Sequence, residues 1–212
     1  MKSSINNAII FAGGDISGFN RNDFDLNSNL IICVDRGVEF AIDNDLEIDI
    51  CIGDFDSIDT KYLDKINSRN ILKQTFNKDK DKSDLELALD YCYENNMKNI
   101  SLFGATGSRL DHTLSNIYLL KKFYDKGVNI QILDKNNTIF YTNKDIILDK
   151  INRYISILPT DEKAIFSISG SKWELNDYRL EFGSTHTISN EFIEDIKIQI
   201  KKGSIFIILA KD

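Results

Sequence analysis

The chain has 212 residues, with a hydrophobic content of 42% and a formal net charge of −7. Its composition is that of a globular protein with a sizeable core, which argues against wholesale disorder. The acidic balance argues against general binding to nucleic acid or to an anionic membrane surface, and leaves room only for a local phosphate site.

The sequence carries neither an apolar run long enough to span a bilayer nor the apolar core and cleavage site of a signal peptide. We therefore expect a cytoplasmic protein that binds neither nucleic acid nor membrane. Its three cysteines lie far apart, without the spacing of a metal site, and are expected to be buried free thiols: Cys33, Cys51 and Cys92.

Short apolar runs alternate with amphipathic stretches in the first part of the chain. The runs are those expected of strands that are buried on both faces. The intervening stretches include residues 83–96 and 109–127, which have the apolar spacing of helices. This alternation indicates a doubly wound, mostly parallel sheet, with strands at residues 8–12, 30–34, 48–52, 72–76, 100–103 and 130–133.

These two helices have recognisable ends. Ser83 and Glu86 form a capping-box pattern at the start of the first helix, and Gly127 is placed to end the second. Four apolar residues of the second helix fall on one face, which is the pattern of a helix that packs against a core: Leu110, Leu114, Ile117 and Tyr118.

After about Lys135 the chain changes to short, mostly alternating segments separated by turn-forming residues. This pattern indicates an antiparallel β-sandwich, with KKG at residues 201–203 as a hairpin turn between the last two strands. We therefore expect an α/β fold in two domains. Residues 1–135 form an N-terminal domain with a doubly wound, mostly parallel sheet, and residues 136–212 form a smaller C-terminal antiparallel β-sandwich domain.

Small or acidic residues follow five of the predicted strands, at the carboxyl edge where parallel sheets bind their ligands. Such a rim of aspartates needs a cation, and Asp54 and Asp56 in the segment GDFDS can converge on one ion. Oxygen ligands without histidine or cysteine suit Mg²⁺. The alternative is a plain turn in which the aspartates cap backbone amides. The strand-end segments are GGD at 13–15, DRG at 35–37, GDFDS at 53–57, the run that ends in Asp81 and Asp84, and GATGS at 104–108.

Asp84 falls in the first turn of its predicted helix, either as a metal ligand or as a carboxylate stabilised by the helix dipole. The stretch GATGSRLDHTLSN, at residues 104–116, combines a glycine loop with Arg109, whose planar fork suits phosphate oxygens. Arg109, His112 and Asn116 share one helical face, with Asp111 beside them. Taken alone, His112 fits a helix-surface or core histidine better than a functional one. Together these groups indicate transfer or hydrolysis of a phosphoryl group, without a P-loop or a protein-kinase glycine loop.

Seven segments in order resemble the motifs of bacterial-type thiamin pyrophosphokinases: GG, DRG, GDFDS, DKSD, GATGSRLDHTLSN, KWELND and STHTISNE. The resemblance runs from about Gly13 to the C-terminus. It implies an N-terminal α/β catalytic domain that binds ATP and Mg²⁺, and a C-terminal β-sandwich that helps to bind thiamin. It also implies a homodimer with sites near the subunit interface. Such enzymes transfer the terminal diphosphate of ATP to the thiamin hydroxyl and release AMP.

The resemblance also implies residue roles. Ser108 stands where the family often has a second glycine, and Ser83 where threonine is common, which affects little beyond the loop conformation. Either Asp84 or Asp111 would accept the hydroxyl proton, and Arg109 would neutralise developing charge. The implied metal ligands are Asp54, Asp56 and Asp84; the nucleotide and reaction site contains Asp35, Arg109, Asp111, His112 and Asn116; and the thiamin side contains Trp173, Ser184, Ser189 and Asn190.

Some alternatives remain at this point. Trp173 fits a sandwich core as well as a pocket, and His186 has no assigned role. A related enzyme class transfers diphosphate to a pterin alcohol, a magnesium-dependent phosphohydrolase would use the same acids, and a non-catalytic sensor would bind thiamin or nucleotide without turnover. KWELND and STHTISNE favour thiamin, and the intact acidic set favours an enzyme.

Overall fold

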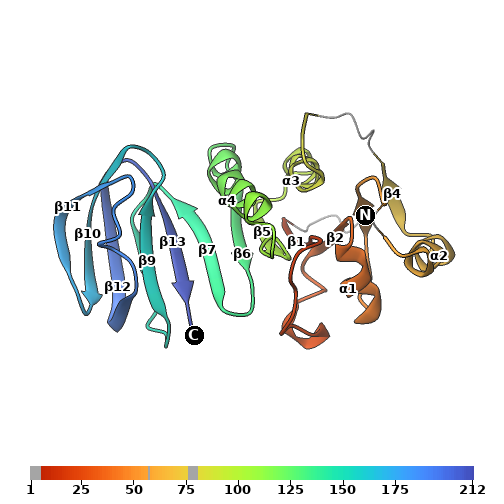
Figure 1. The fold of residues 1–212 in the computed structure, drawn as a ribbon, viewed down its shortest axis with the longest axis horizontal. Helices are drawn as coiled ribbons and strands as arrows, with labels where there is room; N and C mark the ends of the chain where they lie inside the picture. Colours follow the sequence, from red (N-terminus) through yellow and green to blue (C-terminus); the bar gives the residue numbers. More distant parts are fainter. Residues whose placement is uncertain (1–5, 57, 76–80) are drawn as a thin grey trace. The chain divides into compact units, whose positions relative to one another are not determined.

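The computed structural model describes residues 6–56, 58–75 and 81–212 (Figure 1). Two compact units divide the chain between Lys135 and Asn136. Ser57 of the GDFDS segment and Phe76 of the strand expected at 72–76 lie outside the described residues. No helix in the described part of the chain is long and apolar enough to cross a bilayer.

The N-terminal unit is built on a parallel sheet. In the part of it that the structure describes, the strands pair in the order β4-β3-β2-β1-β5-β6, and every pair is parallel. This arrangement confirms the doubly wound sheet expected from the unbroken apolar runs. The strands are β1 (Asn7–Phe11), β2 (Leu30–Val34), β3 (Ile50–Ile52), β4 (Leu72–Gln74), β5 (Asn99–Phe103) and β6 (Asn129–Leu133).

Helices cover both faces of this sheet, with α1 on one side of the strands and α3 and α4 on the other (Figure 1). Apolar residues of α1 and α2 pack with Phe11, Cys33 and Cys51 in one core cluster. All three cysteines are free and buried, as expected. The helical segments are the 3-10 turn η1 (Arg21–Asp23), α1 (Gly37–Asp43), α2 (Thr60–Ser68), α3 (Asp84–Glu94) and α4 (Leu110–Tyr124).

The positions of the predicted helix ends are confirmed, but the capping box predicted at Ser83 is only half formed, because the Glu86 carboxylate bonds to Lys122. The Ser83 hydroxyl accepts a hydrogen bond from the backbone N–H of Glu86 over 3.2 Å, which caps α3. Gly127 has a φ of +83° just beyond α4, and its N–H donates to the Tyr124 carbonyl oxygen over 2.8 Å. Glycine adopts this left-handed conformation without strain, so the chain turns sharply into β6.

The apolar face predicted for α4 is wrong, since three of its four residues are exposed and only Ile117 is half-buried. Leu110, Leu114 and Tyr118 are 70%, 53% and 61% exposed, whereas the buried side chains of the helix are Leu119, Leu120 and Phe123. The helix is rotated from the expected orientation because Thr113 and Asn116 turn toward the loop after β5, where they form hydrogen bonds. An exposed stripe of large apolar side chains, spaced four residues apart, therefore runs along α4.

The C-terminal unit is an antiparallel β-sandwich, as expected from the alternating segments. One sheet contains β7, β13 and β9, the other contains β11, β10, β12 and β8, and the start of the long strand β12 also pairs with β9. Inward-facing isoleucine, leucine and phenylalanine side chains form its core. The strands are β7 (Asn137–Thr142), β8 (Ile146–Leu148), β9 (Tyr154–Pro159), β10 (Lys163–Ser171), β11 (Leu175–Glu181), β12 (Asn190–Lys202) and β13 (Ile205–Ala210).

The hairpin predicted at residues 201–203 is wrong. The strand after the turn, β13, pairs with β7 and β9, and the strand before it, β12, pairs with β8, β9 and β10. Gly203, with a φ of +77°, carries the chain from one sheet to the other. A Cβ at this position would lie 2.6 Å from the Lys163 carbonyl oxygen, so the close approach requires glycine.

Candidate active site

The strand order of the N-terminal unit reverses between β1 and β5. Strands β1 to β4 extend the sheet in one direction, and β5 and β6 extend it in the other. In open α/β sheets, ligands bind at the carboxyl ends of the strands at such a switch point. Here the loops after β1 and β5 are joined by backbone hydrogen bonds of 2.8 Å, from Gly14 N–H to the Gly104 oxygen and from Asp15 N–H to the Thr106 oxygen. A Cβ on Gly14 would overlap both acceptor oxygens, so only glycine allows the loops to join.

A cleft of about 440 Å³ lies at this switch point. Its lining comes from the ends of β1, β2 and β5 and from the starts of α3 and α4. We call this cavity the switch-point cleft. It includes five of the residues predicted from the sequence, which lie far apart along the chain: Asp35, Asp84, Arg109, His112 and Asn116.

Two of these residues are half-buried aspartates from neighbouring parts of the rim. Asp35 follows β2 with a φ of +46°, and its N–H donates to the Ile52 oxygen over 3.1 Å. A side chain at Gly53 would overlap the Asp35 carboxylate, so the glycine of GDFDS makes room for this acid. Asp84 is the first residue of α3, where free backbone amides and the helix dipole favour an ionised carboxylate.

Asp54 and Asp56 lie in a turn in which an aspartate caps a backbone amide, which was the alternative to a metal site. An Asp54 carboxylate oxygen accepts the N–H of Asp56 over 3.1 Å, and between them Phe55, with a φ of +58°, is buried in the core. The described lining of the switch-point cleft includes neither aspartate. Asp54 nevertheless follows the strand next to Asp35, because β2 and β3 are paired with Val34 opposite Ile52.

The donor chemistry of this rim is that of a hard cation. Asp35, Asp54, Asp56 and Asp84 are all carboxylates at the carboxyl edge of the sheet, which fits Mg²⁺ rather than a softer metal. Among residues 6–56, 58–75 and 81–212, no three His, Cys, Asp or Glu side chains are already gathered at metal-binding distance.

Arg109 forms a two-pronged hydrogen bond with Asp111. Its Nε and Nη2 atoms donate to the two carboxylate oxygens over 3.1 and 2.5 Å, at the start of α4. These bonds lower the pKa of Asp111 to about 2 and raise that of Arg109. Both side chains are exposed, and Asp111 is absent from the described cleft lining. Arg109 also lines the switch-point cleft, so the fork fixes an exposed guanidinium in that lining.

The loop at residues 104–108 is held by α4. The Asn116 side-chain amide donates to the Ala105 oxygen over 2.8 Å. The Thr113 hydroxyl accepts the Gly107 N–H over 3.3 Å and donates to the Arg109 oxygen over 3.2 Å. Thr113 is a site residue that was not predicted from the sequence, although its position four residues after Arg109 is the spacing of such a contact on a helix.

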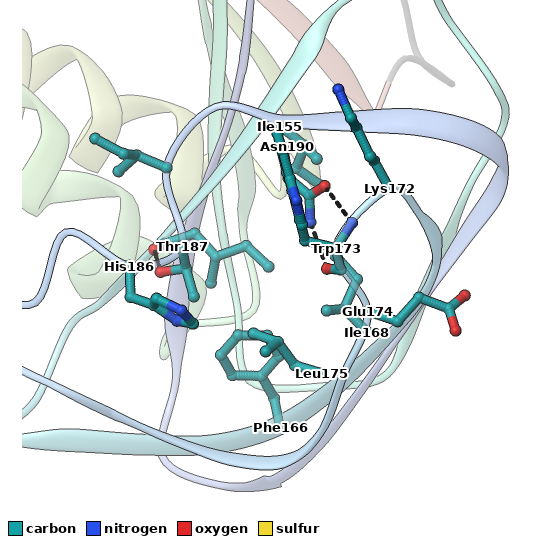
Figure 2. Close-up of a pocket in the computed structure, with 12 residues that line it drawn as sticks. Ile155, Phe166, Ile168, Lys172, Trp173, Glu174, Leu175, His186, Thr187 and Asn190 are labelled. Atoms are coloured by element: carbon teal, nitrogen blue, oxygen red, sulfur yellow. Dashed lines mark hydrogen bonds between the residues drawn. The ribbon is translucent and has the colours of Figure 1, made fainter.

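The C-terminal unit has a pocket of about 640 Å³, whose floor is apolar and whose rim carries Trp173 and Asn190 (Figure 2). Trp173 is not a residue of the sandwich core, because 52% of it is exposed. Asn190, only 9% exposed, accepts the Trp173 N–H over 3.1 Å and donates to the Trp173 oxygen over 2.8 Å. Asn190 therefore fixes the backbone that presents the indole.

The two serines predicted for this side lie next to the pocket and are absent from its described lining. The Ser184 hydroxyl accepts the His186 N–H over 3.3 Å, and the Ser189 N–H donates to the Ser156 hydroxyl over 2.9 Å. His186, which had no assigned role, lines the pocket across from Trp173 (Figure 2). Its ring lies 5.1 Å from that of Tyr178.

Together, an acid-rimmed switch-point cleft and a separate aromatic pocket on a β-sandwich define an α/β enzyme with an accessory small-molecule domain. The family model described as "Thiamin pyrophosphokinase, catalytic domain" matches residues 23–132, and the model "Thiamin pyrophosphokinase, vitamin B1 binding domain" matches residues 140–205. Each unit thus carries one of the two matches.

Known proteins agree with these matches. The chain is 36% identical to the thiamine pyrophosphokinase of Bacillus subtilis over 188 residues, which cover 86% of this chain and 88% of that protein. It is 31% identical over 154 residues to thiamin pyrophosphokinase 1 of Caenorhabditis elegans, covering 67% of this chain and 61% of that one.

Solved structures agree as well. The B. subtilis crystal structure superposes with a TM-score of 0.89 at 31% identity, over 97% of this chain and 99% of that one. The Geobacillus thermodenitrificans structure has a TM-score of 0.87 at 29% identity, over 97% and 98%. The chain belongs to the thiamin pyrophosphokinase family, which confirms the resemblance of its seven motifs.

Proposed function

We propose that the chain transfers diphosphate from ATP to the hydroxyl of thiamin and releases AMP. The thiamin oxygen forms a bond to the β-phosphorus, the bond from that phosphorus to the oxygen shared with the α-phosphorus breaks, and AMP leaves with the electron pair. The observation that carries this proposal is the convergence of Asp35, Asp84, Arg109 and His112 in the switch-point cleft of a family member.

The residue roles follow from charge and position. Arg109 stabilises the negative charge that develops on the transferred phosphates, and Asp111 orients its guanidinium. We assign the hydroxyl proton to Asp84, because Asp84 lines the switch-point cleft, whereas Asp111 is absent from the described lining and is bonded to Arg109. Asp35, His112 and Asn116 complete the nucleotide side of the cleft.

Asp54, Asp56 and Asp84 would hold Mg²⁺, and the bound ion supplies charge neutralisation of the polyphosphate. Asp54 is half-buried and Asp56 is exposed, on one turn with an internal hydrogen bond, and Asp84 begins α3. All three offer oxygen ligands, which is the donor set that Mg²⁺ prefers.

Thiamin binds in the pocket of the C-terminal unit. Its cationic ring faces the indole of Trp173, which already attracts the Lys172 ammonium at 4.6 Å from the ring centroid. Asn190 positions the indole through two hydrogen bonds, and Ser184 and Ser189 support the loop on the other side of the pocket.

A product assay tests the reaction. Purified protein is incubated with ATP, Mg²⁺ and thiamin, and the nucleotides and thiamin species are separated by chromatography. AMP and thiamin diphosphate in equal amounts support the proposal. ADP or free phosphate would instead indicate a kinase or hydrolase, binding without turnover would indicate a sensor, and preference for a pterin alcohol would identify the related diphosphokinase class.

We further propose a homodimer that acts in the cytoplasm. The exposed stripe of Leu110, Leu114 and Tyr118 on α4 is an apolar surface of the kind that interfaces cover. The free cysteines fit a reducing compartment. Light scattering should give the mass of two chains, and Leu114→Glu should give the mass of one; a wild-type monomer would contradict the dimer.

A further inference from the structure

The segment that follows β6 lies against both loops of the switch-point cleft. β6 pairs with β5, with Phe103 opposite Leu133, so the residues after the two strands leave the sheet side by side (Figure 1). The loops after β1 and β5 both contribute to the lining of the cleft. The residues after β6 are Asp134 and Lys135, which belong to the N-terminal unit and are absent from the described lining.

Asp134 holds the loop after β5 through a threonine. The Thr106 hydroxyl donates to an Asp134 carboxylate oxygen over 3.1 Å, and both residues are half-buried. A hydroxyl bond to a carboxylate is stronger than a bond between neutral groups, and partial burial strengthens it further. Because Thr106 lines the cleft, Asp134 fixes a residue of that lining.

The same threonine also holds the loop after β1. Its backbone oxygen accepts the Asp15 N–H over 2.8 Å, next to the bond from the Gly14 N–H to the Gly104 oxygen. A Cβ on Gly14 would lie 2.3 Å from the Thr106 oxygen, so the two loops are in direct contact at this point. A shift of Thr106 would therefore move both loops.

Lys135 supports the loop after β1 directly. Its Cγ and Cδ atoms would lie 3.0 and 3.1 Å from a Cβ on Gly18, so the stem of the lysine lies against that glycine. The pKa of Asp15 is lowered mainly by its bond to the Ser17 N–H and, to a smaller extent, by the Lys135 ammonium. Two neighbouring residues of one segment thus act on the two loops.

We propose that Asp134 is a positioning residue for the reaction, and that it holds both loops of the cleft in place through Thr106. This inference rests on the proposed function, because it takes the switch-point cleft as the reaction site. In this role Asp134 acts through Thr106 rather than by contact with the reacting groups. Misplacement of a site by about 1 Å can lower the turnover number by roughly a hundredfold, so a loop support of this kind affects the rate.

The test compares disruptive with conservative variants of the pair. Thr106→Val replaces the hydroxyl by a methyl group, and Asp134→Ala removes the acceptor. Thr106→Ser keeps the donor, and Asp134→Asn keeps an acceptor oxygen. Thr142→Val is the matched control, because the Thr142 hydroxyl also makes a hydrogen bond, accepting the Lys144 N–H over 3.0 Å. The described linings of the cleft and of the C-terminal pocket do not include Thr142.

The first readout is turnover. Thr106→Val and Asp134→Ala should each lower kcat for thiamin diphosphate formation by roughly tenfold and leave the KM for thiamin unchanged. The double variant should lower kcat no further, because both changes remove the same contact. The conservative variants and the control should keep most of the wild-type kcat.

The second readout is amide hydrogen exchange, measured by NMR without substrate. The Gly14 and Asp15 N–H groups bond across the two loops, so they should exchange faster by roughly fivefold or more when the loops loosen. This change should occur in Thr106→Val and Asp134→Ala and be absent from the conservative variants and the control.

The outcomes separate this inference from the proposed function. Faster exchange together with a lower kcat, both restored in Thr106→Ser, supports the positioning role. Unchanged exchange in both disruptive variants overturns it, and so does a wild-type kcat in a variant whose loops exchange faster. A wild type that forms no thiamin diphosphate would overturn the proposed function, and the exchange rates would still decide whether Asp134 holds the two loops. Should Asp134→Ala fold poorly, Thr106→Val decides both readouts.

Discussion

Asn116, in the second turn of α4, donates a hydrogen bond of 2.8 Å to the backbone oxygen of Ala105 in the loop after β5. Ala105 is 3% exposed, so its oxygen has little access to water as a replacement partner. This bond connects a predicted site residue to the loop at residues 104–108, which is in turn bonded to the loop after β1.

Asn116→Ala should therefore impair both the loop and the activity. We expect a loss of about 1–3 kcal/mol in the free energy of unfolding, because a buried acceptor loses its donor, and a fall in kcat of roughly tenfold or more, because the loop shifts. Asn95→Ala is the matched control, since Asn95 makes the same kind of bond to the Tyr91 oxygen at an exposed position. Equal effects in the two variants would contradict the positioning role.

Because of its hydrogen bonds to Arg109, Asp111 should not contribute to the pH dependence of activity above pH 5. The folded-state pKa of Asp111 is about 2, below its ordinary value of 3.8, so the contribution of this group is complete above the ordinary value and is lost only as the pH falls toward 2. Asp111→Asn should lower kcat/KM by loosening Arg109, without moving the acidic limb of the pH profile measured from pH 5 upward. A shift of that limb would identify Asp111 as a titrating catalytic group.

Asp90 on α3 should stabilise the pairing of α3 with α4. Its carboxylate accepts hydrogen bonds from Lys82 over 2.7 Å and from Lys126 of the segment after α4 over 3.0 Å, and only 16% of the side chain is exposed. Burial raises its pKa and the two lysines more than offset this, so the pKa of Asp90 lies below 3.8. The stabilisation is present above that pH and is lost as the pH falls through the folded-state value.

Asp90→Asn should therefore reduce the free energy of unfolding by about 1–3 kcal/mol at neutral pH, measured with urea, and by less at pH 3. Asp45→Asn provides the comparison. Asp45 pairs with Arg69 over 3.5 Å with 84% of its side chain exposed, so its loss should cost no more than about 0.5 kcal/mol. A pH-independent loss at Asp90 would show that its charge is not the stabilising feature.

Trp173 and Asn190 should separate binding from stability in the C-terminal unit. Trp173→Ala should raise KM for thiamin by roughly tenfold and leave KM for ATP unchanged, with little change in unfolding because the residue is half exposed. Asn190→Ala should cost about 1–3 kcal/mol, since the Trp173 backbone loses two hydrogen bonds. Trp173→Phe should recover part of the thiamin affinity, and failure to do so would argue against a ring-face contact.

The sequence predicted the elements better than their orientation. Unbroken apolar runs such as residues 30–34 identified the buried parallel strands, because strands covered on both faces need apolar side chains throughout. On α4 the same reasoning chose the wrong face: Leu110, Leu114 and Tyr118 have helical spacing, but periodicity does not indicate which partner an apolar face meets. The hairpin prediction at Gly203 was wrong for a similar reason, since the residues of a turn do not distinguish a hairpin from a crossing between two sheets.

The site residues that lie near the carboxyl ends of the parallel strands were predictable from the sequence. Asp35, Asp84 and Arg109 follow or face strand ends of a parallel sheet, and topology alone brings such residues into one cleft. The place of His186 in the pocket lining and the packing of Phe19 against Phe103 were not predictable, because both depend on contacts between segments that are distant in sequence.

The most direct test of the switch-point cleft as the reaction site is the turnover number of Asp84→Asn. Asp84 lines the cleft at the start of α3, so its replacement should lower kcat for thiamin diphosphate formation by roughly a hundredfold to a thousandfold. The free energy of unfolding should change by no more than about 1 kcal/mol, the usual value of a carboxylate at a helix N-terminus. Wild-type turnover in a folded Asp84→Asn variant would contradict the account and place the chemistry elsewhere.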